Sequence, residues 1–252
     1  MIIKAVFFDC WDTLLDDTVE LSGNIELRLA KQLSHARRVD GEVVNAEVRS
    51  EGKRFAAAIR AGRTVLTPTK RLKSILDSLP GAKPGEGDDT QLIRRTLANV
   101  DAAVHCIPVP PLPGARDILA ELSAAGLTIC LVSNTGWISS IAVRHVLERY
   151  SLMQYFSFCY FSEDGYYPKP NPEMFVCGLR DLAIEPSNAV HVGDQVRSDG
   201  VAALTAGLQR VVILEGRSRY REHQQTPFSA DPRIIRVDSL NSGARAIADL
   251  RF

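Results

Sequence analysis

Short apolar runs, rich in β-branched and aromatic side chains, recur along the chain, and polar residues follow each of them. Continuous apolar runs of this length are typical of strands that are buried on both faces of a parallel sheet. The pattern therefore predicts strands over residues 2–8, 127–132, 189–192, 211–214 and 234–237.

Apolar residues with helical spacing lie between these runs. They predict helices over 115–125, 138–149, 172–183 and 201–206, and glycines follow the first and last of them, as at many helix ends. Strand and helix thus alternate along the second half of the chain. This alternation predicts an α/β fold, with a Rossmann-like parallel sheet flanked by helices.

The segment between the first two predicted strands is too long for a simple connection. A strand–helix–strand crossover needs about 30 residues, whereas the first run ends near Asp9 and the next begins at Leu127. The surplus is amphipathic and predicts four further helices, over 19–33, 41–61, 67–79 and 90–105, with a glycine-rich break at 81–87.

A proline-rich linker at 108–114 ends the inserted helical segment. We therefore expect an α/β core formed by residues 1–15 and 108–252. An all-α domain over 16–107 is expected to be inserted into this core.

Composition excludes several classes of protein. The chain has 252 residues, 45% of them hydrophobic, and its 30 basic residues balance 30 acidic ones. Such a balance gives no general attraction to nucleic acid or to an anionic membrane, so we expect neither as a partner. No stretch approaches the roughly 18 to 20 apolar residues that span a bilayer.

The five cysteines form no C-x-x-C pair, so reduced thiols in a soluble, cytoplasmic protein are expected. The oligomeric state stays open.

Polar residues stand directly after the predicted strands, where open parallel sheets bind ligands. One further candidate, a lysine, precedes a predicted helix. The residues are Asp9, Asp12, Thr13, Ser133, Asn134, Lys169, Gly193, Asp194 and Asp199.

This set of residues suits phosphoryl transfer. It offers a carboxylate nucleophile, a hydroxyl group to hold a phosphate, a lysine to offset charge and acidic residues for a hard cation. Two carboxylates about 4 Å apart repel each other by on the order of 4 kcal/mol at an effective dielectric constant near 20. Mg²⁺ takes oxygen ligands and bridges to phosphate, so it would relieve this repulsion. The sequence therefore predicts a Mg²⁺ site and a small phosphorylated substrate.

The same residues resemble the four motifs of the haloacid dehalogenase superfamily, in that superfamily's order across the chain. The first motif is Asp-x-Asp-x-Thr, the second an apolar strand ending in Ser-Asn, the third Lys-Pro-x-Pro-x-x-Phe and the fourth Gly-Asp with a later Asp. They match DCWDT at 9–13, LVSN at 131–134, KPNPEMF at 169–175 and GDQVRSD at 193–199.

The resemblance implies a nucleophile and a metal site. Asp9 would attack phosphorus to form an aspartyl-phosphate and would also bind Mg²⁺. The other implied ligands are the backbone carbonyl of Trp11 and the carboxylates of Asp194 and Asp199.

The resemblance also implies residues that bind the substrate. Ser133 would hold the transferring phosphoryl group, Asn134 would contact the substrate beside it, and Lys169 would stabilise the developing charge. The inserted helical domain lies where one class of this superfamily carries a mobile cap.

One position departs from the family pattern. The second Asp of the first motif is the general acid and base of the family's phosphatases, and here Trp11 replaces it. Indole exchanges no proton near neutral pH, and loss of general acid–base catalysis costs about 10²- to 10⁴-fold in rate. Asp12 is one residue out of register, at a position that is often occupied without a catalytic role.

Three interpretations remain after this departure. In the first, the chain is a phosphatase that uses Asp12, a cap residue or a substrate with a good leaving group. In the second, it is a 2-haloacid dehalogenase-like hydrolase, a branch that carries an aromatic residue at this position. In the third, it is a weakly catalytic binding or regulatory module. The intact Asp194 and Asp199 favour the phosphatase, because halide displacement needs no magnesium.

Overall fold

The computed structural model of the chain describes residues 2–17, 19–61, 63, 65–81, 89–216 and 226–250. Its internal contacts divide the chain into two compact units. The core unit comprises Met1–Asp16, Pro110–Asn134 and Leu147–Phe252, and the helical unit comprises Asp17–Val109 and Thr135–Val146.

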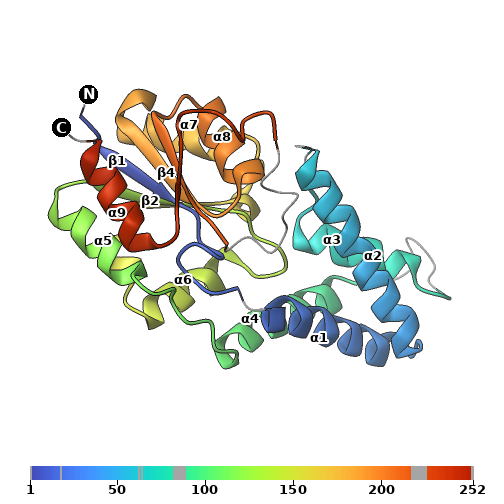
Figure 1. Cartoon of the computed structure of the whole chain (residues 1–252). Coiled ribbons are helices and arrows are strands. Elements are labelled where there is room, and N and C mark those ends of the chain that lie inside the picture. The colour runs from blue at the N-terminus through green and yellow to red at the C-terminus, as the bar shows by residue number, and fades with distance from the viewer. Residues whose placement is uncertain are drawn as a thin grey trace. The chain divides into compact units, whose positions relative to one another are not determined.

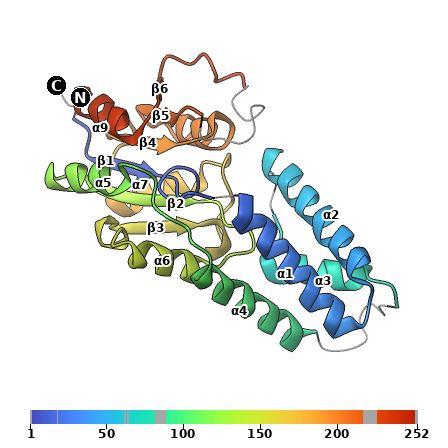
Figure 2. The same ribbon diagram turned by 60° about the horizontal axis from the view of Figure 1, so that its bottom comes forward.

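The core unit is built on a six-stranded sheet in which every neighbouring pair of strands is parallel. The order β3-β2-β1-β4-β5-β6 can be followed in Figure 2. This confirms the predicted α/β fold. The strands are β1 (Ala5–Phe8), β2 (Thr128–Ser133), β3 (Phe158–Phe161), β4 (Ala189–Gly193), β5 (Arg210–Leu214) and β6 (Ile234–Val237).

Helices cover both faces of this sheet (Figure 1). Val211 and Ile213 of β5 pack in one apolar cluster with Leu204, on the face of α7 and α8. Val212 points to the opposite face, where its side chain lies beside Gly243 of α9. Successive side chains of a strand alternate between faces, so the apolar run at 211–214 serves both layers. The helices of this unit are α5 (Ala115–Ala124), α7 (Glu173–Leu182), α8 (Val201–Thr205) and α9 (Leu240–Asp249).

Two elements of the core unit were not predicted from the sequence. Strand β3 has only four residues, lies at the sheet edge, and begins with the 42% exposed Phe158, so it lacks the fully buried run of a central strand. Helix α9 was also missed. Its Ser239 N-cap accepts a hydrogen bond from the backbone N–H of Ser242, which is a normal helix start signal.

The helical unit contains the four helices predicted for the inserted segment. Asp40 caps α2 through the N–H groups of Glu42 and Val43, and Thr67 caps α3. The helices are α1 (Val19–Arg37), α2 (Gly41–Arg60), α3 (Pro68–Ser78) and α4 (Thr90–Cys106), and α6 (Ser140–Arg149) runs from this unit into the core unit. The predicted break at 81–87 lies, apart from Gly81, outside the described residues.

A buried arginine joins three segments of the helical unit. The side chain of Arg71 in α3 is 2% exposed, and its Nε donates to Glu51 Oε1 of α2 at 2.6 Å. Its Nη1 donates to the carbonyl oxygen of Gly136, and its guanidinium lies 3.8 Å from the ring centroid of Phe55 and 3.7 Å from that of Trp137. These contacts attach Thr135–Val146 to the inserted helices, whereas the predicted division assigned this segment to the core.

No helix in the described ranges combines the length and the apolar character that crossing a membrane requires.

Tight packing of α7 on β1 gives a first prediction. A Cβ atom at Gly178 would lie 2.6 Å from Cε1 of the buried Phe7 ring and 3.2 Å from Cε2 of Tyr160. We expect Gly178→Ala to lower the free energy of unfolding by about 1–3 kcal/mol, because overpacking a core displaces rings and backbone. Gly243→Ala in α9 is the matched control, since its Cβ would meet nothing closer than 3.5 Å. Urea unfolding measures both, and equal losses in the two variants would contradict the packing argument.

Candidate active site

The centre of the site lies at the carboxyl ends of β1 and β4. These strands are neighbours, with Phe8 opposite Val192, and the N–H of Asp9 continues the pairing by donating to the carbonyl oxygen of Val192 at 2.9 Å. The strand order reverses direction between β1 and β4, which is where open α/β sheets form their ligand crevice. Asp9 and Asp194 each follow one of these two strands, so the sheet itself brings them together.

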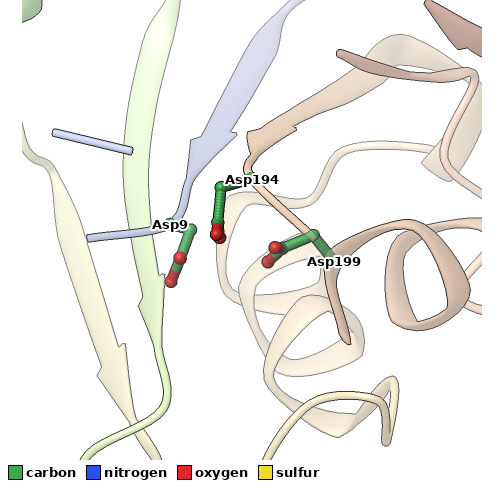
Figure 3. Close-up of side chains that lie close together, drawn as sticks. All are labelled: Asp9, Asp194 and Asp199. Atoms are coloured by element: carbon green, nitrogen blue, oxygen red, sulfur yellow. The ribbon is translucent and has the colours of Figure 1, made fainter. Parts of the chain in front are cut away.

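Three carboxylates meet at this point (Figure 3). Oxygen atoms of Asp9, Asp194 and Asp199 lie within 4.8 Å of one another, and all three side chains are buried. Asp199 comes from a π-helical turn, η4 (Val196–Gly200), and its Oδ2 accepts a hydrogen bond from the N–H of Gln195 at 3.0 Å. A wide turn of this kind is common at functional sites.

Gly193 is required by the approach of Asp199. A Cβ atom at position 193 would lie 2.4 Å from Cγ of Asp199, a distance at which either group would have to move. The Gly-Asp pair of the fourth motif therefore has a local physical reason: the glycine leaves space for one carboxylate, and the aspartate supplies another.

Lys169 lies between two of the carboxylates. Its Nζ donates to Asp9 Oδ1 at 2.7 Å and to Asp199 Oδ1 at 2.6 Å, and the lysine is 1% exposed. Charge-assisted hydrogen bonds in a buried place are strong, and removing one partner leaves an uncompensated charge. The structure thus unites four of the predicted residues: Asp9, Lys169, Asp194 and Asp199.

His191 is a part of the site to which the sequence analysis gave no role. It is fully buried in β4, where Nε2 lies 3.1 Å from Asp199 Oδ1 and Nδ1 lies 3.0 Å from the carbonyl oxygen of Phe7. The only signal in the sequence is a polar ring within an apolar strand. Its contact with Asp199 depends on the turn that follows the strand, which the sequence pattern does not specify.

Two buried hydroxyl groups of the predicted motifs have no hydrogen-bond partner in the described part of the chain, namely Ser133 Oγ and Thr13 Oγ1. Ser133 ends β2, which pairs with β1 so that Leu131 is opposite Phe8. Leaving a buried hydroxyl unpaired costs about 1–3 kcal/mol. A bound anionic group would satisfy Ser133, as the sequence analysis expected.

The loop after β1 carries Trp11 and Asp12. Trp11 is half-buried and its backbone pairs with Leu15 in an isolated bridge, while the N–H of Asp12 donates to the carbonyl oxygen of Leu15. Asp12 has φ 55°, a left-handed conformation that is uncommon for residues other than glycine. The loop is therefore a tight, strained turn, of the kind that concentrates at functional sites.

Electrostatics at the site are dominated by burial and by an excess of negative charge. Burial raises the pKa of Asp9 to about 6, although Lys169 opposes this shift. Burial also raises the pKa of Asp194 well above its ordinary value, and the neighbouring carboxylates of Asp199 and Asp9 raise it further. A divalent cation with oxygen ligands fits these residues, since it would offset charge that Lys169 alone leaves unbalanced.

The pKa of Asp199 shifts in the opposite direction to those of Asp9 and Asp194. Burial alone would raise its pKa, but Lys169 and His191 together hold it well below its ordinary value. Burial would lower the pKa of Lys169, and the carboxylates of Asp199 and Asp9 instead raise it above its usual range. The lysine is thus held as a cation and Asp199 as its anion.

The site thus consists of a buried carboxylate at the end of a parallel α/β sheet, which is held by a lysine and faced by two further carboxylates. The chain belongs to the family of haloacid dehalogenase-like hydrolases, because the model of this family matches residues 3–207.

Similar proteins include phosphatases. The chain is 28% identical over 218 residues to the phosphoglycolate phosphatase of Shigella boydii, a match that covers 85% of this chain and 82% of that protein. It is 31% identical over 103 residues to the human haloacid dehalogenase-like hydrolase domain-containing protein 3. That second match covers 41% of this chain and 39% of the human protein, so it spans well under two thirds of the relative.

Solved structures share the fold. The 2-haloacid dehalogenase of Pseudomonas syringae has a TM-score of 0.68 at 22% identity, covering 99% of this chain and 100% of that one. The HAD-hydrolase YfnB of Bacillus subtilis, solved with bound magnesium, has a TM-score of 0.62 at 17% identity, covering 98% and 99%.

The charge excess gives a second prediction, for Asp194→Asn in the metal-free protein. Because the pKa of Asp194 is raised in the fold, the folded state retains a proton that the unfolded chain releases near the ordinary pKa of 3.8. The free energy of unfolding of the wild type therefore falls as pH rises from that value through the folded-state pKa. The asparagine variant lacks this loss, so we expect its stability relative to wild type to grow between pH 5 and pH 8.

Thermal unfolding in EDTA measures this difference. Asp231→Asn is the matched control, because Arg233 lowers the pKa of Asp231 and the contribution of Asp231 to stability is lost only when the pH falls. Its effect should be equal at pH 5 and pH 8. A stability gap for Asp194→Asn that shrinks with rising pH would contradict the assignment.

Proposed function

We propose that the protein is a Mg²⁺-dependent phosphatase of a small phosphorylated metabolite, with Asp9 as the nucleophile. The observation that carries this proposal is the buried cluster of Asp9, Asp194 and Asp199, in which Lys169 bridges Asp9 and Asp199. The phosphoglycolate phosphatase relative, which matches over most of its length, supports a phosphorylated substrate. The likeness to YfnB, which was solved with magnesium, supports the choice of metal.

In the proposed reaction, a carboxylate oxygen of Asp9 attacks phosphorus, and the bond from phosphorus to the leaving oxygen breaks. Lys169 supplies positive charge beside the attacking carboxylate and orients Asp9 by donating a hydrogen bond to its Oδ1. Ser133 Oγ would donate a hydrogen bond to the transferring group, which gives the unpaired hydroxyl a partner. Water then attacks the phosphorus of the aspartyl-phosphate, the bond from phosphorus to the Asp9 oxygen breaks, and inorganic phosphate leaves while the Asp9 carboxylate is regenerated.

Mg²⁺ would be held by Asp9, Asp194, Asp199 and the backbone carbonyl of Trp11, and when bound it would neutralise phosphate charge. A cation beside Asp9 would also favour its ionised form. With a pKa raised to about 6 by burial, part of the Asp9 population is protonated just below neutral pH, and a protonated carboxyl is a poor nucleophile. Positive charge beside Asp9 lowers this pKa and keeps the nucleophile ionised.

Trp11 restricts the substrate in this proposal. It leaves position 11 without a group that can protonate a leaving oxygen. The enzyme is therefore suited to substrates whose leaving group needs little protonation, such as acyl or aryl phosphates, unless Asp12 or a residue of the helical unit supplies the proton.

The proposal extends to the helical unit and to the location of the protein. We propose that the helices inserted after the first motif serve as the cap that the resemblance implies and select the substrate. We place the enzyme in the cytoplasm, where Mg²⁺ is abundant and where the five cysteines, all free in the structure, would stay reduced.

A dehalogenase-like hydrolase is the second candidate, favoured by the aromatic residue at position 11. It differs from the first in needing no Mg²⁺ and in releasing halide rather than phosphate.

A substrate panel tests the proposal. We expect Mg²⁺-dependent phosphate release from at least one of phosphoglycolate, sugar phosphates, acyl phosphates and aryl phosphates. Asp9→Asn should lower kcat on the order of 10³-fold or more, because the nucleophile is lost. Asp231→Asn, the same change at a residue outside the site, should leave kcat unchanged. Halide release from 2-haloacids without Mg²⁺ would instead support the second candidate, and activity of neither kind would contradict both.

Trp11→Asp tests the account of position 11. If Trp11 stands where an acid is needed, the aspartate should raise kcat for alkyl phosphates by about 10- to 100-fold, toward the gain expected of general acid catalysis. Aryl phosphates should gain much less, because their leaving groups depart without a proton. Trp11→Asn is the control, as it has the same size as the aspartate but no acid. Equal gains on alkyl and aryl phosphates would contradict this account.

A further inference from the structure

The side chain of Asn134 forms two hydrogen bonds with the backbone of Lys169. Its Nδ2 donates to the carbonyl oxygen of Lys169 at 2.8 Å, and its Oδ1 accepts from the N–H of Lys169 at 2.8 Å. One amide thus satisfies both backbone groups of a residue 35 positions away, as a neighbouring strand would. Both of these contacts lie within the core unit.

The two ends of Lys169 are therefore fixed by different elements. The ammonium end is held by Asp9 and Asp199, while the backbone end is held by Asn134, which directly follows β2. A lysine side chain has four flexible bonds and loses up to about 2 kcal/mol of rotamer entropy when it is ordered. Fixing its Cα against the sheet lets the chain reach both carboxylates in one conformation.

Other contacts of the Lys169 loop act within the loop. Asn171 Oδ1 accepts from the N–H of Glu173, and the N–H of Asn171 donates to the carbonyl oxygen of Pro168. These bonds give the loop its shape but do not attach it to the sheet. The Asn134 amide connects the loop to the end of the strand that carries Ser133.

We propose that Asn134 is a positioning residue that acts through Lys169. It places the lysine so that the ammonium bridges Asp9 and Asp199. Its side chain is committed to this contact, which differs from the substrate-binding part that the sequence analysis expected for Asn134. The catalytic consequence rests on the proposed function, whereas the placement of Lys169 does not.

A double-mutant cycle tests the catalytic consequence. Asn134→Ala should lower kcat by about 10- to 100-fold with little change in KM, since a displacement of 1 Å can cost about 10²-fold. In a Lys169→Ala background the same change should lower kcat less than about twofold, because the residue through which it acts is gone. Losses that multiply in the double variant would overturn the proposal, and so would a rise in KM with kcat unchanged.

Asn134→Asp provides a second variant of nearly unchanged shape. It keeps an acceptor for the N–H of Lys169 but places a carboxylate oxygen against the Lys169 carbonyl, so it should also lower kcat. Asn241→Ala is the matched control, as it removes an exposed asparagine amide of the same unit, in α9, without touching the Lys169 loop. Its kcat should stay within about twofold of wild type by the usual size of surface effects.

Amine labelling reports the placement of Lys169 without any turnover. Lys169 is buried, so an amine-reactive reagent should label it slowly in the wild type, whereas the exposed Lys4 labels quickly. In Asn134→Ala, labelling of Lys169 measured by peptide mass spectrometry should become at least about tenfold faster, while the rate at Lys4 stays the same; this factor is equivalent to about 1.4 kcal/mol of lost protection. An unchanged rate at Lys169 would overturn the inference. If no phosphate ester is hydrolysed but labelling accelerates, the proposed function fails and the positioning role stands.

Discussion

The structure of the core unit depends on placing one ammonium group between two carboxylates in a dry interior. Lys169, Asp9 and Asp199 come from three separate segments, yet Lys169 Nζ lies 2.7 Å from Asp9 Oδ1 and 2.6 Å from Asp199 Oδ1. Ions lose several kcal/mol of solvation when they are buried, and good geometry must return it. This requirement explains the features around the group: Gly193 leaves space for Asp199, the π-helical turn directs Asp199 inward, and His191 Nε2 lies 3.1 Å from Asp199 Oδ1.

The same physics operates separately in the helical unit. Arg71 is as deeply buried as Lys169 and is likewise held by a carboxylate, here Glu51, with the rings of Phe55 and Trp137 on its two faces. The consequence differs because no excess of carboxylates remains here: Glu51 is contacted by two arginines, Arg71 and Arg54. The buried Arg71 group joins helices and the segment Thr135–Val146 into one unit. The site in the core unit, by contrast, has three carboxylates for one lysine, and that excess is what a divalent cation would relieve.

Much of the candidate site could be predicted because parallel sheets gather the carboxyl ends of their strands along one edge. Asp9, Ser133 and Asp194 each follow an apolar run, so their proximity follows from the fold class alone. His191 could not be predicted, because inside a strand a polar ring has no pattern that distinguishes a partner of Asp199 from a core residue. The double contact between Asn134 and Lys169 was equally out of reach, since it joins loops 35 residues apart.

The sequence by itself determined the class of fold, the central strands, the inserted helices and the family, because apolar periodicity and short motifs are local properties of the chain. It also determined that Trp11 replaces the usual acid. Only the tertiary structure decided that β3 is the edge strand, that Thr135–Val146 packs with the inserted helices, and that the Asn134 amide binds the backbone of Lys169. Each of these depends on which distant segments share a low-dielectric interior, where every buried charge and polar group must find its partner, and no local pattern of residues specifies that choice.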